Sequence, residues 1–173
     1  MKEAKFIQIK NSFSMLCKVE INIQAKAGVI WSLLTDAEGF PRWNSTVSHI
    51  DGQIREGERI NIHVPGTKRT FKPTVSDVVE NEYMMWSDGV ALIFKGSRAF
   101  QLKPCDNGST DFIMEERFQG LVFAMVKRLL PDFRLIFERY ANDLKLEAER
   151  VASPTHNLDY TIAPESAEIA FNN

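Results

Sequence analysis

The residues best suited to chemistry lie on two strand-like segments that a short turn connects. In GSRAFQL, residues 96–102, side chains alternate between two faces, so Arg98 shares a face with apolar neighbours. The turn DNG, residues 106–108, is typical of a three-residue hairpin loop, in which Gly takes the left-handed position. Counting back along both strands from this loop places Arg98 directly opposite Glu116, on the apolar face.

An Arg–Glu pair on an apolar face has two interpretations. The first is a structural ion pair at a partly solvated sheet end, which is worth about 0–1 kcal/mol. The second is an enclosed pair on a cavity wall, where Arg98 anchors a carboxylate, phenol or carbonyl group of a ligand. Glu116 then holds the guanidinium, or acts as a weak general base if burial raises its pKa. Burying a charge is costly, so a pair that is enclosed favours the second interpretation. A pair that is open to solvent favours the first.

Aromatic and methionine side chains near this pair would either line a cavity or fill a core, and both alternatives stay open. Ligand pockets are mostly apolar, with a few polar groups that fix the orientation of the ligand. The candidates for contact with a ligand, besides Arg98 and Glu116, are Met84, Trp86, Phe94, Phe100, Phe112, Met114, Phe118, Phe133 and Phe137. By contrast, Trp31 and Trp43 are expected to stabilise a region of short helices.

The elements that must position these residues follow from the periodicity of apolar side chains. Residues 15–23 alternate as a half-buried strand does, and residues 25–35 have helical spacing, with a short turn or second helix at 40–43. Residues 46–118 are strand-like with turn signals between segments, and residues 120–150 have a helical stripe. This order predicts an α+β fold, an antiparallel sheet of about six to seven strands with helices on one side.

Length and composition limit the class of protein. With 173 residues, a single domain of residues 1–152 is expected, followed by a tail of residues 153–173 without a core of its own. A net charge of −2 offers no basic field for nucleic acid, and no window is apolar enough for a membrane span. Two cysteines, Cys17 and Cys105, suit a reducing compartment, so a cytoplasmic location is expected.

No motif indicates a metal or a cofactor. The three histidines are scattered, without cysteine or carboxylate partners at ligand spacing: His49, His63 and His156. The serines lack a G-x-S-x-G setting, and the glycines form neither a dinucleotide loop nor a phosphate loop. We therefore expect neither a bound metal nor a cofactor.

Several stretches of the chain resemble the START-like superfamily, also called SRPBCC or helix-grip proteins. They are INIQAKAGVIWSLLTDAEGFPRWN, GQIREGERI, FKPTV, YMMW, FKGSRAFQL and ERFQGL, and the resemblance covers about residues 15–150. The subgroup that the chain is most similar to is that of the bacterial polyketide cyclase/dehydrase-like proteins. The resemblance implies a curved antiparallel sheet wrapped around a long C-terminal helix, with two short helices after the first strand and a hydrophobic cavity inside.

The resemblance and the apolar sheet face together predict binding of a small hydrophobic or amphipathic molecule, lipid-like or polyketide-like, in that cavity. A first alternative is a metal-free aromatase/cyclase in which Arg98 and Glu116 assist enolisation and dehydration of a polyketide. A second is a protein-binding module like the heat-shock-protein ATPase activators. Apolar residues of the tail could also dock on a second copy and form a homodimer: Ile162, Ile169 and Phe171.

Overall fold

The computed structural model describes residues 4–67, 70–90, 92–126 and 132–153. A six-stranded antiparallel sheet has the strand order β1-β2-β9-β8-β7-β6, and β3, β4 and β5 form a separate sheet. The strands of the large sheet are β1 (Lys5–Lys10), β2 (Ser14–Ile23), β6 (Thr74–Val79), β7 (Tyr83–Val90), β8 (Phe94–Pro104) and β9 (Thr110–Gln119). The small sheet consists of β3 (His49–Asp51), β4 (Asn61–His63) and β5 (Thr70–Phe71).

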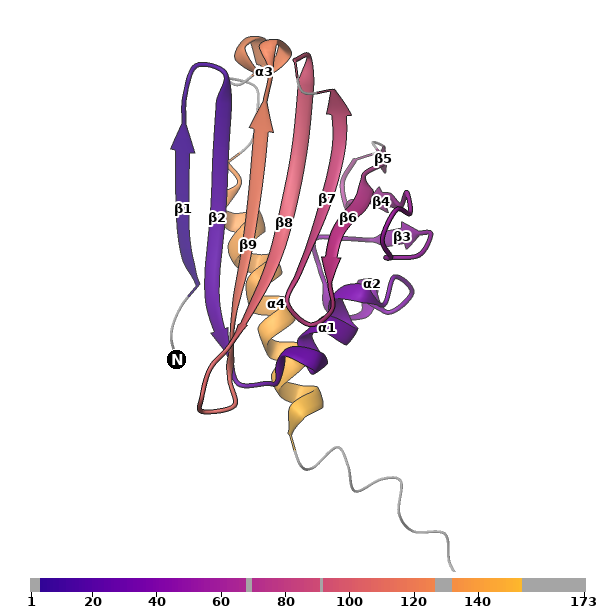
Figure 1. Cartoon of the computed structure of the whole chain (residues 1–173), viewed down its shortest axis with the longest axis vertical. Helices are drawn as coiled ribbons and strands as arrows, with labels where there is room; N and C mark the ends of the chain where they lie inside the picture. The colour runs from indigo at the N-terminus through magenta and orange to yellow at the C-terminus, as the bar shows by residue number, and fades with distance from the viewer. Residues whose placement is uncertain (1–3, 68–69, 91, 127–131, 154–173) are drawn as a thin grey trace, which may run out of the picture.

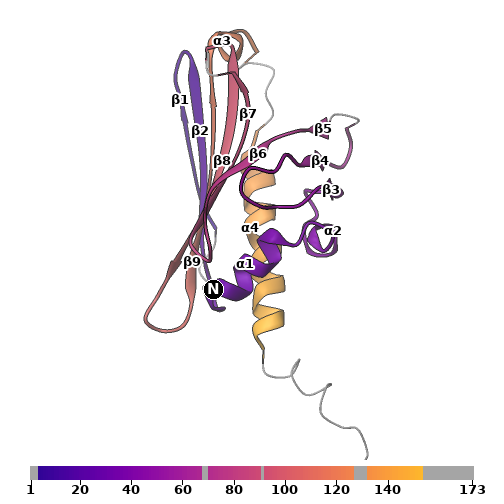
Figure 2. The same ribbon diagram turned by 45° about the vertical axis from the view of Figure 1, so that its right-hand side comes forward.

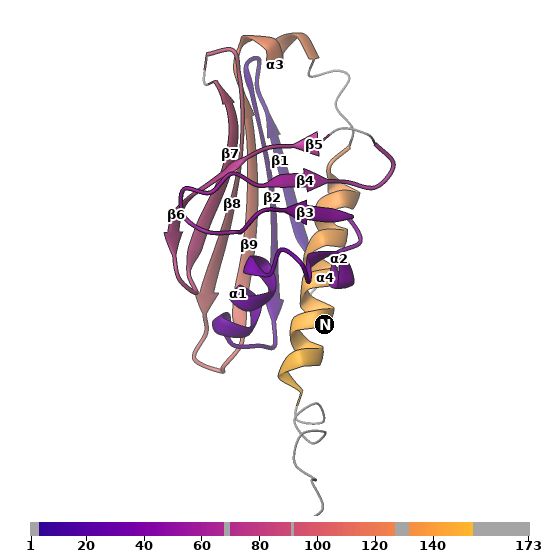
Figure 3. The same ribbon diagram turned by 90° about the vertical axis from the view of Figure 1, so that its right-hand side faces the viewer.

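Four helices lie among the described residues: α1 (Ala27–Thr35), α2 (Phe40–Trp43), α3 (Leu121–Val126) and α4 (Arg134–Ala152). Figure 1 shows α4 running behind the large sheet, and Figure 2 shows the sheet and α4 as two layers. In Figure 3, α1, α2 and the small sheet lie on the side of the large sheet that faces α4. This arrangement confirms the predicted α+β fold. None of the helices in the described part of the chain is long and apolar enough to cross a membrane.

Apolar periodicity decides which faces meet between these layers. Met15, Cys17 and Val19 alternate along β2 and are buried, as the sequence predicts. On α4, residues at spacings of three and four turn toward the sheet and are buried: Phe137, Tyr140, Ala141, Leu144 and Ala148. These two apolar surfaces form the core between the sheet and the helix.

The structure corrects the sequence prediction at three places. Strand β1 was not predicted and forms one edge of the large sheet. Residues 70–79, within the region predicted as strand-like, are divided at Pro73 into β5 and β6 of different sheets, because proline cannot donate a ladder hydrogen bond. The helix predicted over 120–150 is present as α3 and α4, and residues 127–131 between them lie outside the described residues.

Residues 154–173 of the predicted tail also lie outside the described residues. The division into a domain of residues 1–152 and a tail, and the idea that the tail mediates a dimer, therefore stay predictions.

Gly120 provides a test of how tightly the strand ends pack. Its φ is +123°, and a Cβ atom there would stand 2.4 Å from the backbone oxygen of Ile93. We expect Gly120→Ala to lower the free energy of unfolding by about 2–3 kcal/mol, through backbone strain and this clash. Gly57 is the control, since its φ is +79° and nothing lies within 4 Å of its built Cβ.

Urea denaturation of both variants would check this expectation. Gly57→Ala should cost about 1 kcal/mol, the cost of the left-handed backbone alone. If both variants lose the same free energy of unfolding, the clash between a side chain at Gly120 and Ile93 does not contribute to the loss.

Candidate functional site

The β8–β9 hairpin brings the predicted Arg–Glu pair together. Cys105 N donates to Ser109 O at 2.9 Å, and Gly108 N donates to Cys105 O at 3.0 Å. Gly108 has a φ of +80°, as the three-residue loop requires. The strand register then pairs Arg98 with Glu116, which confirms the register predicted from the sequence.

The two side chains form a short, mostly enclosed ion pair. Arg98 Nη2 lies 2.6 Å from Glu116 Oε2, and Arg98 Nε donates to the same oxygen at 3.1 Å. The side chains are 24% and 15% exposed, so the pair has limited contact with solvent. Charge-assisted hydrogen bonds of this length are among the stronger ones in proteins.

Helix α4 covers the pair with two aromatic rings. The Arg98 Cζ atom lies 5.7 Å from the centroid of the Phe137 ring and 5.9 Å from that of Tyr140. Burial alone would lower the pKa of the Arg98 guanidinium, but the charge and hydrogen bonds of Glu116 outweigh it and raise this pKa. Arg98 is therefore a fixed cation beneath α4, held by a carboxylate on one side and by ring faces on the other.

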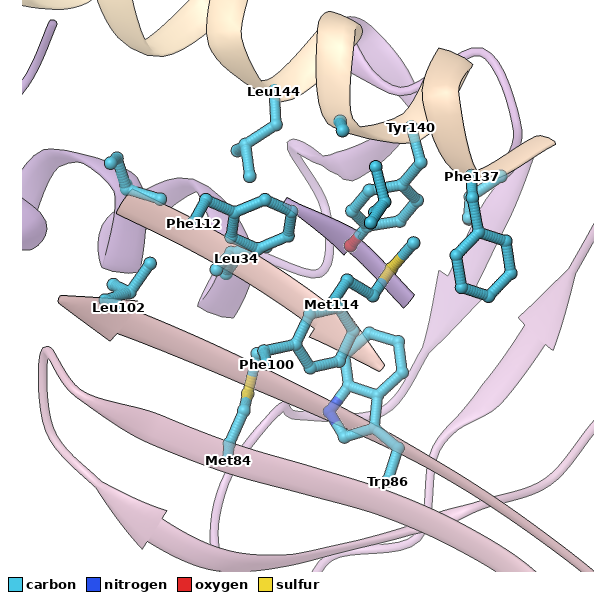
Figure 4. Packing of buried hydrophobic residues seen from close by; sticks show 14 of the residues in the cluster. Leu34, Met84, Trp86, Phe100, Leu102, Phe112, Met114, Phe137, Tyr140 and Leu144 are labelled. Carbon is cyan, nitrogen blue, oxygen red and sulfur yellow. The ribbon is translucent and has the colours of Figure 1, made fainter. Parts of the chain in front are cut away.

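The pair belongs to a row of side chains that crosses the inner face of the large sheet. The register aligns Cys17 with Glu116, Glu116 with Arg98, and Arg98 with Trp86. In the next row toward the hairpin loop, Met114 pairs with Phe100, and both are buried. Figure 4 shows Trp86, Phe100 and Met114 packed beneath α4, together with Phe112, Met84 and Tyr140.

On the opposite side of the row the packing is looser. Gly96 pairs with Phe118 there, and a Cβ at Gly96 would meet only the Phe118 ring, at 3.8 Å. The rings of Phe118 and Phe133 stack with centroids 5.3 Å apart, and Phe94 lies 6.2 Å from Phe118. All three rings are partly exposed. The ion pair thus stands at the boundary between a filled core and a more open, aromatic part of the inner face.

The candidate residues from the sequence therefore fall into two groups. Those that the structure packs into the core are Met84, Trp86, Phe100, Phe112, Met114 and Phe137, and those that stay partly exposed are Phe94, Phe118 and Phe133. Whether either group contacts a ligand stays a prediction. Sequence reasoning missed Tyr140 as a neighbour of Arg98, although it lies three residues after Phe137 on the same helical stripe.

The reactivity of Cys17 reports whether solvent reaches the row of side chains that crosses the inner face of the large sheet. Burial, together with the charge of Glu116 opposite it, raises the pKa of its thiol to about 11. We expect iodoacetamide at pH 8 to leave Cys17 unmodified in the folded protein, because the thiolate is the reactive form. Cys105 is partly exposed and should be alkylated. Mass spectrometry of tryptic peptides would check this, and equal labelling of both cysteines would contradict the enclosure of the row.

Other polar groups gather at two further places. Asp51 accepts hydrogen bonds from His49 at 2.7 Å and from His63 at 3.0 Å, which lower the pKa of its carboxyl group. Among the residues that the structure describes, no group of three or more His, Cys, Asp or Glu is placed to hold a metal ion. His156 lies outside the described residues.

The second place is a polar pocket of about 610 Å³ between the β8–β9 loop and α4, which the sequence did not predict. It is lined by Asn22, Gln24, Cys105, Asp106, Asn107, Ser109, Asp111, Lys145 and Glu149. Several of these groups bind one another: Lys145 pairs with Glu149, and Asn22 donates to Asp111.

Comparisons with solved structures show the same fold in proteins of low sequence identity. A conserved protein of unknown function from Enterococcus faecalis is 17% identical, with a TM-score of 0.64 over 90% of this chain and 83% of that one. A START superfamily protein from Mycobacterium smegmatis is 21% identical, with a TM-score of 0.58 over 79% and 98%. A point mutant of Thalictrum norcoclaurine synthase, in complex with a transition-state analogue, is 13% identical, with a TM-score of 0.62 over 86% and 100%.

A search of curated protein sequences finds no match. The family described as "Activator of Hsp90 ATPase homolog 1-like protein" matches residues 24–141. This range extends from the end of β2 into α4 and includes Arg98 and Glu116. The match covers more than half of the chain and agrees with the helix-grip arrangement of sheet and helix. The chain therefore belongs to the Activator of Hsp90 ATPase homolog 1-like family, within the START-like (SRPBCC) superfamily.

Proposed function

We propose that this protein binds a small hydrophobic or amphipathic molecule, lipid-like or polyketide-like, between the inner face of the large sheet and α4. The observation that carries the proposal is the enclosed Arg98–Glu116 pair at the boundary between the filled core and the partly exposed rings. Replacing enclosed ion pairs by apolar residues is often neutral or stabilising. An enclosed pair beside aromatic rings is thus better explained by recognition of a ligand than by stability.

The chemistry of the pair supports an anchoring role for Arg98. Both hydrogen bonds to Glu116 go to a single carboxylate oxygen. A guanidinium has five N–H donors in a planar fork, so Arg98 has the capacity to bind a ligand oxygen as well. Partly exposed Phe118 and Phe133 would contact the apolar part of the ligand.

Native mass spectrometry of the purified protein, followed by solvent extraction, would test the proposal. We expect a bound molecule whose mass is lost on denaturation, and a lower occupancy in Arg98→Leu. Arg117→Leu is the matched control, because Arg117 pairs with Glu115 on the outer face of β9, the strand that carries Glu116. The proposal fails if no molecule is bound and a lipid and polyketide panel gives no binding, or if an experimental structure has a wholly filled interior.

One observation favours a second candidate function, that of a protein-binding module. Apolar residues of the β7–β8 turn and of α3 lie at one end of the molecule (Figures 1 and 3), and Leu92, Leu121 and Met125 are 65–81% exposed. Large exposed apolar patches often mark interaction sites. A stable stoichiometric protein complex, formed without any small ligand, would favour this alternative over ligand binding.

Catalysis of the polyketide aromatase/cyclase type is the enzymatic alternative. In that case Arg98 and Glu116 would contact the substrate, with Glu116 as a weak base. Unchanged turnover in the double variant Arg98→Leu, Glu116→Gln would exclude both residues from the mechanism. A cytoplasmic location stays a prediction.

A further inference from the structure

Four buried side-chain groups have no hydrogen-bond partner among the described residues. They are Trp43 Nε1, Asn44 Nδ2, Trp86 Nε1 and Tyr140 Oη. Buried polar groups in folded proteins are nearly always hydrogen-bonded, so each exception requires an explanation, such as a water molecule or a ligand. Four exceptions in one part of a small protein indicate that an acceptor binds there.

The side chains that carry these groups lie beside Arg98 or beside one another. Trp86 is the register partner of Arg98 on the neighbouring strand, and the Tyr140 ring lies 5.9 Å from Arg98 Cζ. The Trp43 ring lies a further 5.9 Å from that of Tyr140, and Asn44 follows Trp43 in the chain. Figure 4 shows Trp86 and Tyr140 extending from the sheet and from α4 into the same interior region. The groups therefore form a path from the ion pair into the interior.

Three of these groups can only donate, and the fourth, the Tyr140 hydroxyl, is able to donate. An indole N–H donates and cannot accept. The orientation of the Asn44 amide is set by Thr46, whose N and Oγ1 donate to Asn44 Oδ1 at 2.9 and 2.7 Å, which leaves Nδ2 as the inner atom. Burial raises the pKa of the Tyr140 phenol, so its hydroxyl stays protonated and able to donate. With the N–H groups of Arg98 that do not bind Glu116, the path presents mainly donors.

We infer that the polar end of the ligand is a hydrogen-bond acceptor without protons, a carboxylate or a carbonyl compound, and that Tyr140 and Trp86 bind it together with Arg98. The inference rests on the proposed function and names the class of ligand. An amine at this place would set its N–H groups against the N–H groups of the two indoles and of Asn44. A carboxylate or carbonyl oxygen supplies acceptor sites for several donors, including the N–H groups of Arg98 that do not bind Glu116.

The first test compares two probes of equal chain length, dodecanoate and dodecylamine, below their micellar concentrations. Isothermal titration calorimetry at pH 7 should give an affinity for dodecanoate at least about 10-fold higher, as expected for charge-assisted donors. If dodecylamine binds as tightly, the inference is overturned and the proposed function stands. If neither probe binds, the inference is overturned, and native mass spectrometry with the lipid and polyketide panel decides separately whether the proposed function stands.

The second test removes one hydroxyl group. Tyr140→Phe keeps the ring and should weaken dodecanoate binding by about 5-fold while leaving dodecylamine binding unchanged. Tyr83→Phe is the matched control, since Tyr83 is partly exposed on the opposite face of β7 from Trp86. In the ligand-free protein, Tyr140→Phe should not lower the Tm, because it removes an unpaired group. A lower Tm with unchanged dodecanoate affinity would show that the hydroxyl has a structural partner such as ordered water, which overturns the inference.

Discussion

Replacing Phe100 by alanine is expected to lower the free energy of unfolding by about 3–5 kcal/mol, the range for truncating a buried phenylalanine. Phe100 is 1% exposed. Its ring lies 4.8 Å from Trp86, 6.1 Å from Tyr140 and 6.5 Å from Phe112, measured between centroids. The substitution therefore removes contacts with three other rings and leaves a cavity between the sheet and α4. Urea denaturation followed by circular dichroism would measure the loss.

Phe13 supplies the control for this substitution. It is 58% exposed in the turn between β1 and β2, so Phe13→Ala should cost less than about 1 kcal/mol. The comparison also decides the role of Phe100, for which the sequence left a ligand contact and a filled core as alternatives. If Phe100→Ala costs no more than Phe13→Ala, the interior around Phe100 is not tightly packed, and a ligand could occupy that part of the inner face.

The position of the Arg98–Glu116 pair could be predicted from the sequence because it needs only local information. The loop type follows from Asp106-Asn107-Gly108, and the period of two along each strand then determines every pairing of β8 with β9. The burial of alternate residues in β2 follows from the same period. These features depend on neighbouring residues and are insensitive to how the layers pack.

Features that depend on packing between layers were not predictable in the same way. In β1 the pattern is misleading, because Ile7 and Ile9 point to the exposed face, and Phe6 is the residue that packs against Phe137 of α4. An edge strand that is apolar on its solvent side has no clean amphipathic signal. The path of unpartnered polar groups depends on how α2, β7 and α4 pack against one another. No local pattern in the sequence encodes that packing.

The ion pair itself gives the second large effect. We expect Arg98→Leu to lower the free energy of unfolding by about 2 kcal/mol, since Glu116 would keep its enclosed charge without a partner. The value is set below the range for fully buried pairs because Arg98 is 24% exposed. Glu116→Leu should cost a similar amount, for the converse reason. The double variant should recover most of the loss and cost about 1 kcal/mol, so the coupling energy of the double-mutant cycle should reach about 3 kcal/mol.

Arg117 and Glu115 make the matched comparison, because they lie on β9 beside Glu116 and face the other way. Their side chains are 54% and 36% exposed and 3.3 Å apart, so their coupling energy should be below about 0.5 kcal/mol. A coupling of the Arg98–Glu116 pair as small as this would mean that water screens it as it screens a surface pair. In that case the enclosure on which ligand anchoring depends would have no energetic consequence. A clear difference between the two cycles would show that one hairpin carries an ordinary surface pair outside and a desolvated, oriented guanidinium inside.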